Sequence, residues 1–171
     1  MACVLTTALT KPCGEGVSGL KKVWAVEFAA LNTMTVTAGV VTAMALDATK
    51  VFFGWEFEPG NASMSNPIQR SRENGTLYYE HKLTVKMNRY ETTKKNEIKI
   101  ISASDVALIA LDRNGKYWLL GRENGLTLES GTASIGAAMG DFSGFELAFT
   151  GMEPDFPVEV DSSTVTSLAL S

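Results

Sequence analysis

Apolar and polar residues alternate along most of this chain, and a period of two is typical of strands with one buried face. The clearest example is Leu77–Met87, in which every second residue is apolar or aromatic except for one histidine. The residues predicted to face inward there are Tyr79, His81, Leu83, Val85 and Met87. Further strands are predicted at Lys22–Phe28, Met34–Ala38, Val40–Ala45 and Val51–Phe57, the last with Val51, Phe53, Trp55 and Phe57 on one face.

A second group of strands lies between Asp105 and Gly151. Asp105–Asp112 is an almost unbroken apolar run, and Asn114-Gly115 separates it from Tyr117–Leu120. An Asn-Gly pair between two hydrophobic runs is a strong hairpin signal, and it predicts a type I′ turn with positive φ at both residues. Leu126–Leu128 and Phe145–Thr150 complete the group.

One helix is predicted at about 89–102, with Asn88 as its cap and Glu91 in the capping-box position. Glu91 and Lys95 are spaced as an i,i+4 ion pair. Several strands, one helix and more strands predict a mostly β, α+β fold. We expect an antiparallel β-sandwich or barrel with this one flanking helix.

Three segments show no period. Glu58–Asn74 is predicted to be a long loop at the tip of a hairpin formed by Val51–Phe57 and Leu77–Met87, and loops of that length are usually functional or disordered. Ser130–Asp141 consists mostly of small residues, and prolines interrupt the chain after Gly151. We therefore expect an N-terminal arm at 1–20, a β domain at 21–151 and an acidic C-terminal arm at 152–171.

The chain has 171 residues, enough for one domain with a substantial core. Its net charge of −4 is uneven, because the last twenty residues contain no Lys or Arg. The acids of that stretch are Glu153, Asp155, Glu159 and Asp161. A neutral body and an acidic tail argue against a general nucleic-acid binder. No segment has the features of a secretory signal or a spanning helix, so we expect no membrane association.

Candidate chemistry is sparse. His81, the one histidine, lies on an apolar strand face, which favours a buried imidazole over a catalytic base. Cys3 and Cys13 fit two reduced thiols or a local disulfide. We expect no catalytic, cofactor-binding or metal-binding residues. An enzyme would need a cleft around His81. A carbohydrate-binding module would need Trp24, Trp55 and Trp118 exposed together.

Basic residues gather on one strand and on the predicted helix. They are Lys82, Lys86, Arg89, Lys94, Lys95 and Lys99. These residues form either a solvated face balanced by neighbouring acids or a seam that meets acidic residues of a neighbouring copy.

Four segments carry a family resemblance. Asn114–Gly121, Glu123–Gly131 and Gly140–Gly151, together with the upstream run Leu83–Glu97, resemble virion proteins of crAss-like and related tailed bacteriophages. The similarity covers roughly residues 75–151, with weaker agreement over Lys22–Phe57. Those virion proteins look like tail-tube or tail-ring components.

This resemblance implies a non-enzymatic virion subunit in the tail or neck. Copies would join into rings around a lumen through which DNA passes without sequence-specific binding, and neighbouring tail, portal or neck proteins would be further partners. A ring connector of a short-tailed virion is the alternative. The implied contacts with neighbours lie in the long loop, the helix and the acidic tail: Ser65-Asn66, Ile68, Arg70, Arg72, Lys94, Lys95, Asp155, Glu159 and Asp161.

Overall fold

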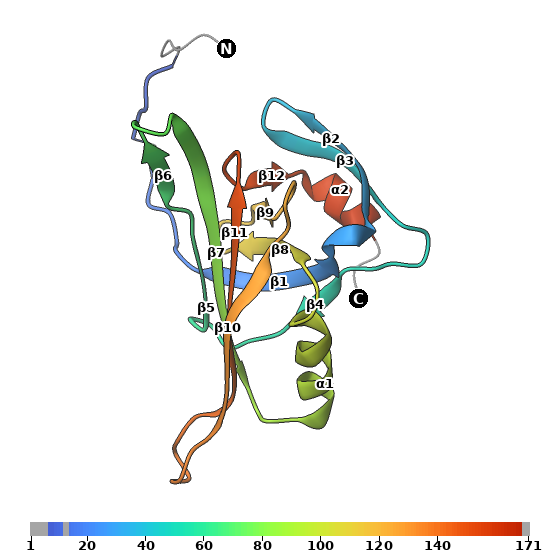
Figure 1. Ribbon diagram of the computed structural model, residues 1–171, viewed down its shortest axis with the longest axis vertical. Coiled ribbons are helices and arrows are strands. Elements are labelled where there is room, and N and C mark those ends of the chain that lie inside the picture. The colour runs from blue at the N-terminus through green and yellow to red at the C-terminus, as the bar shows by residue number, and fades with distance from the viewer. Residues whose placement is uncertain (1–6, 12–13, 169–171) are drawn as a thin grey trace.

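The computed structural model describes residues 7–11 and 14–168. Both Cys3 and Cys13 lie outside the described residues. Figure 1 shows two crossing sheets, with a helix beside them at the lower end. The elements are β1 (Leu20–Glu27), η1 (Phe28–Ala30), β2 (Leu31–Thr37), β3 (Val40–Leu46), β4 (Phe53–Trp55), β5 (Ala62–Ser65), β6 (Ile68–Ser71), β7 (Thr76–Asn88), α1 (Thr92–Ile101), β8 (Val106–Asp112), β9 (Tyr117–Leu120), β10 (Thr127–Ile135), β11 (Ser143–Glu153), β12 (Val158–Val160) and α2 (Ser162–Ser167).

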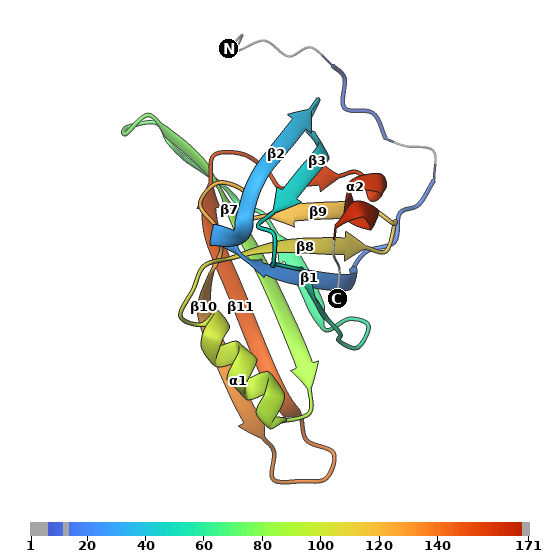
Figure 2. The same ribbon diagram turned by 90° about the vertical axis from the view of Figure 1, so that its right-hand side faces the viewer.

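The strands form two sheets. The seven-stranded sheet has the order β2-β3-β12-β9-β8-β1-β4, and the five-stranded sheet has the order β10-β11-β7-β5 with β6 also paired to β7. Strands of the two sheets run across one another in both views (Figures 1 and 2). The prediction of a mostly β sandwich with a flanking helix is confirmed. Within the described part of the chain, no helix is long and apolar enough to cross a membrane.

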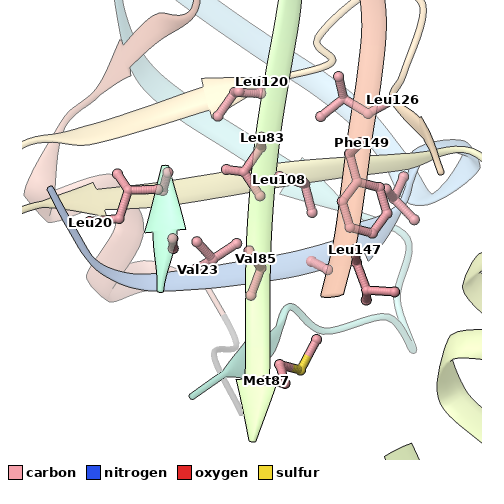
Figure 3. Packing of buried hydrophobic residues seen from close by; sticks show 14 residues of the cluster. Leu20, Val23, Leu83, Val85, Met87, Leu108, Leu120, Leu126, Leu147 and Phe149 are labelled. Atoms are coloured by element: carbon pink, nitrogen blue, oxygen red, sulfur yellow. The ribbon is translucent and has the colours of Figure 1, made fainter. Parts of the chain in front are cut away.

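The main core fills the space between the sheets. Its centre is formed by Leu83 and Val85 of β7, Phe149 of β11 and Leu108 of β8, all at most 1% exposed (Figure 3). The predicted inward face of Leu77–Met87 is confirmed from His81 onward, because burial alternates strictly up to Met87. Burial of each such side chain stabilises the fold by about 1.5–3 kcal/mol.

The central strands β1, β8 and β9 of the seven-stranded sheet are buried on both faces, and this explains their apolar runs. Leu108 of β8 points into the main core, whereas Ile109 belongs to a second cluster on the opposite face. The second cluster is closed by β3, β12 and α2, which contribute Val41, Val160 and Val165. A strand buried on both faces has a continuous hydrophobic sequence rather than an alternating one.

The acidic C-terminal segment is not an extended arm, and this corrects the prediction for 152–171. β12 lies between β9 and β3, with Val158 opposite Leu119 and Glu159 opposite Val40. The β domain therefore continues beyond Gly151 through α2. Val158 and Val160 are 7% and 2% exposed, so the hydrophobic effect holds this segment on its own domain.

The turn at Asn114-Gly115 differs from its prediction. At Asn114-Gly115 only the glycine has a positive φ, of 84°, and the Gly115 N–H donates to the Asp112 carbonyl at 3.2 Å. This is a three-residue loop, so the type I′ prediction there was wrong. The turn with positive φ at both central residues is Ala38-Gly39, with φ of 52° and 80°, between β2 and β3.

The predicted loop Glu58–Asn74 contains β5 and β6. Both strands pair with β7 in one register, from Ala62 opposite Val85 to Ser71 opposite Thr76. Pro67 separates them because it has no N–H to donate, although its carbonyl still accepts the Glu80 N–H at 2.9 Å. The hairpin is therefore formed by this segment and β7, and β4 pairs with β1 in the other sheet.

Two further strand predictions need correction. Val51–Phe57 is strand only over Phe53–Trp55, and its fully buried residue is Phe52, whereas Phe53 on the predicted face is 58% exposed. The small-residue segment Ser130–Asp141 is strand as far as Ile135, because β10 pairs with β11 along its full length.

The helix is shorter than predicted. β7 continues to Asn88, Arg89 has a positive φ of 67°, and α1 begins at Thr92 with Glu91 as its N-cap. Asn88 therefore does not cap it, and the Glu91 carboxylate pairs with Lys94 at 3.3 Å rather than with Lys95. In Figure 2, α1 lies against the lower part of the five-stranded sheet.

Candidate interaction surfaces

His81 is a packed core residue. It is 1% exposed, its Nε2 lies 2.9 Å from the Asp155 carbonyl oxygen, and the Gly121 N–H donates to its Nδ1 at 3.4 Å. Nε2 therefore carries the proton in the neutral ring. Burial lowers the pKa of His81, and this effect outweighs the hydrogen bond to Asp155 and the nearby carboxylates of Glu153 and Asp155.

Glu153 is a second buried titratable group, at 3% exposed. Its carboxylate accepts the N–H of Asn124 at 2.9 Å and the N–H of Glu123 at 3.2 Å. The Asn124 side chain donates to the Met152 carbonyl at 2.7 Å. These bonds fasten the loop after β9 to the end of β11, which is a structural role.

The three tryptophans are packing residues. Trp24 is 7% exposed and faces Tyr117, with ring centroids 6.0 Å apart. Trp55 lies against Phe149 at 5.4 Å, and Trp118 Nε1 donates to an Asp112 carboxylate oxygen at 3.2 Å. They form no shared aromatic platform. In the part of the chain that the structure describes, no group of three or more His, Cys, Asp or Glu residues could hold a metal ion.

A long stretch of open backbone lies along β10, an edge of the five-stranded sheet. One side of this nine-residue strand pairs with β11, and its side chains are almost all exposed. Residues Ser130–Ser134 are small and uncharged. Proteins that remain monomeric usually protect such edges with lysine, proline or a covering element. We call this surface the β10 edge.

The end of the five-stranded sheet that is formed by β6 and the start of β7 carries an apolar surface. β7 extends beyond the seven-stranded sheet together with β6 (Figures 1 and 2). Ile68 lies opposite Tyr79, and the Tyr79 and Phe156 rings are 4.3 Å apart. Ile68, Leu77 and Phe156 are 57%, 52% and 44% exposed. We call these four residues the hairpin patch.

A groove separates α1 from β4 and has a volume of about 880 Å³. Its apolar lining comes from Phe53 and Trp55 on the strand and from Ile100 and Ile101 on the helix. β4 is an edge strand of the seven-stranded sheet, so the side of its backbone that faces away from β1 is unpaired beside the groove. We call this the helix groove.

The predicted contact residues are distributed over these surfaces. Ile68 lies in the hairpin patch, with Arg70 opposite Leu77 on the same face. Ser65 and Arg72 are exposed on or next to the same edge. The Asn66 Oδ1 is buried without a hydrogen-bond partner among the described residues.

The predicted pairing of basic helix and acidic tail is not made within one copy. Lys94 contacts Glu91 and donates to the Asn88 carbonyl at 2.8 Å, and Lys95 is exposed. The acids of the tail have their own contacts. The Asp155 carboxylate accepts the Phe156 N–H at 2.8 Å, the Glu159 carboxylate pairs with Lys116 at 2.9 Å, and the Asp161 carboxylate accepts from the Ser163 hydroxyl. In both views α1 lies in the lower part of the molecule, and β12 and α2 of the tail lie above it (Figures 1 and 2).

Sequence reasoning missed the β10 edge and the helix groove. The β10 edge was hidden because Ser130–Ser134 has no apolar alternation. The groove depends on how α1 and β4 meet, and they are distant in sequence. No family model, curated protein or solved structure matches the chain, so the function is argued from these surfaces and from the resemblance.

Proposed function

We propose that this protein is a non-enzymatic structural subunit that assembles with copies of itself into a ring. In keeping with the sequence resemblance, the ring would belong to the tail tube or neck of a tailed bacteriophage and would enclose a passage for DNA. The single observation that carries the proposal is the β10 edge, which is long, exposed and free of charged gatekeepers after Glu129.

The two edges of the five-stranded sheet favour a repeating contact. β10 forms one edge and the β5–β6 strand forms the other. Pairing of the β10 edge of one copy with the β5–β6 edge of the next is a heterologous contact, and such contacts generate a ring when the rotation closes. The backbone hydrogen bonds left open on each copy would then be satisfied by its neighbours.

The charges of the sheet fit a passage for DNA. On the outer face, Lys82 pairs with Glu80 at 2.9 Å and Lys86 lies 3.9 Å from Glu146. Basic residues neutralised by neighbouring acids hold phosphates weakly, because little counterion release accompanies their contact. DNA could therefore slide past this face without being retained.

The test is the assembly state of the full-length protein, measured by light scattering after size exclusion and by electron microscopy for annuli. Thr132→Lys places a charge on the β10 edge, opposite Glu146 in β11, and should lower the assembled fraction. Thr84→Lys makes the same change on the central strand β7 and is the matched control. A protein that stays monomeric at its highest soluble concentration would contradict the proposal.

A further inference from the structure

The helix groove is an unusually exposed apolar site for a folded domain. Phe53 and Ile100 stand at its mouth and are 58% and 57% exposed. Trp55 and Ile101 lie deeper and pack against the main core. The volume of about 880 Å³ is in the range of sites that bury a ligand or a short peptide. The unpaired edge of β4 runs along one wall and offers backbone hydrogen bonds to an added strand.

The margin of the groove is acidic. Its lysines are already engaged, since Lys50 pairs with Glu27 at 2.6 Å and Lys94 with Glu91 at 3.3 Å. Glu56 and Glu97 also line the groove, and neither has an ion-pair partner among the described residues. A complementary occupant is therefore an extended segment that carries an apolar side chain next to a basic one.

The chain carries a segment of this kind before β1. Residues 7–11 have no regular secondary structure and are exposed throughout. Leu9 is 104% exposed, and Lys11 follows two residues later. In an extended conformation these two side chains point to the same side, about 7 Å apart.

The segment points away from the groove of its own copy. Val17 is fixed to the β8–β9 loop, because its N–H donates to the Asn114 Oδ1 at 3.0 Å and its carbonyl accepts from the Asn114 Nδ2 at 2.9 Å. In both views the chain before β1 leaves the sheet at the end opposite α1 and the groove (Figures 1 and 2). A second copy is therefore the natural source of the occupant.

We propose that the helix groove receives residues 7–11 of a second copy. The segment adds to the edge of β4 as a short strand, with Leu9 between Phe53 and Ile100 and with Lys11 beside Glu56 and Glu97. This inference rests on the proposed self-assembly and adds a second contact, distinct from pairing at the β10 edge. Each copy has one segment and one groove, so the contact is again heterologous.

A fluorescein-labelled peptide of residues 5–12 tests the site directly, by its anisotropy when titrated with the full-length protein. We expect saturable binding that weakens about tenfold or more when Phe53→Glu is introduced. Ile68→Glu is the matched control, because Ile68 is equally exposed but lies in the hairpin patch. Thermal melts of both variants establish that they fold.

Charge reversal tests the orientation of the segment. A peptide with Lys11→Glu should bind up to about fivefold more weakly to the unmodified protein, and Glu97→Lys in the protein should restore its binding. Absence of saturable binding, or binding that Phe53→Glu leaves unchanged, overturns the inference. If the unmodified protein forms rings but does not bind the peptide, only the groove is overturned. Peptide binding to a protein that forms no assemblies supports the groove and contradicts the ring.

Discussion

Removal of the chain after Pro157 should unfold this protein rather than merely prevent its assembly. β12 supplies the strand between β9 and β3, so its loss separates the β2–β3 hairpin from the rest of the seven-stranded sheet. α2 would be lost as well, and its Val165 is 2% exposed.

The magnitude follows from the buried side chains. Val158, Val160 and Val165 are all at least nine-tenths buried in the second cluster. At about 1.5–3 kcal/mol each, their burial is worth roughly 5–9 kcal/mol. The free energy of unfolding of a whole domain is about 5–15 kcal/mol, so the truncated chain has little stability left.

Urea unfolding followed by circular dichroism measures this directly. The truncated chain should show no cooperative transition, or a midpoint far below that of the full chain. Two point variants on β12 refine the test. Val160→Ala should cost about 1.6 kcal/mol or more, whereas Glu159→Ala removes only an exposed ion pair and should cost less than about 1 kcal/mol. A truncated chain that unfolds with the midpoint and slope of the full chain would refute the reasoning.

Three further predictions concern the buried polar groups and one close approach. Because burial lowers the pKa of His81, its contribution to stability is complete above about pH 6.5 and is lost as the pH falls below that value; His81→Gln should flatten this dependence below about pH 6.5 in urea titrations. Glu153→Gln should lower the free energy of unfolding by about 1–3 kcal/mol. The carboxylate accepts hydrogen bonds from two backbone N–H groups, whereas the amide would turn its own NH₂ donor toward one of them. Gly144→Ala should cost about 1–3 kcal/mol in thermal melts, because its Cβ would lie 2.1 Å from the Met87 carbonyl oxygen. Gly140→Ala, with no atom within 4 Å, is the control and should change stability by less than about 0.5 kcal/mol.

The sequence predicted the strands that have a strong hydrophobic pattern of their own. From His81 to Met87 the sequence alternates because one face is buried and the other is partly exposed. Asp105–Asp112 is continuously apolar because β8 is buried on both faces. In each case the hydrophobic pattern reflects the burial directly, so no knowledge of the tertiary arrangement was needed.

The short strands were missed because tertiary pairing stabilises them. β5 and β6 consist mainly of polar or small residues and are separated by Pro67. Hydrogen-bonded pairing with the long strand β7 stabilises both of them. β12 has three residues, and it pairs with β3, more than a hundred residues earlier in the chain. A local pattern cannot report such contacts. Charge was equally misleading, because Glu153 and Glu159 are tied to their own domain.

The five-stranded sheet is covered at one end and exposed at the other, and this difference restricts where neighbouring copies can bind. α1 covers the lower overhang of the five-stranded sheet, where Ile98 and Ile101 pack against the core and Tyr90 stacks on Phe145 with ring centroids 4.9 Å apart. Among the described residues no helix covers the upper overhang, and Ile68, Leu77 and Phe156 of the hairpin patch are exposed there. The unsatisfied surfaces are thus apolar side chains at one end, an open backbone edge along β10, and the helix groove at the other end. Because these three surfaces lie on different parts of the molecule, each can contact a different neighbour, as a subunit within a closed assembly requires.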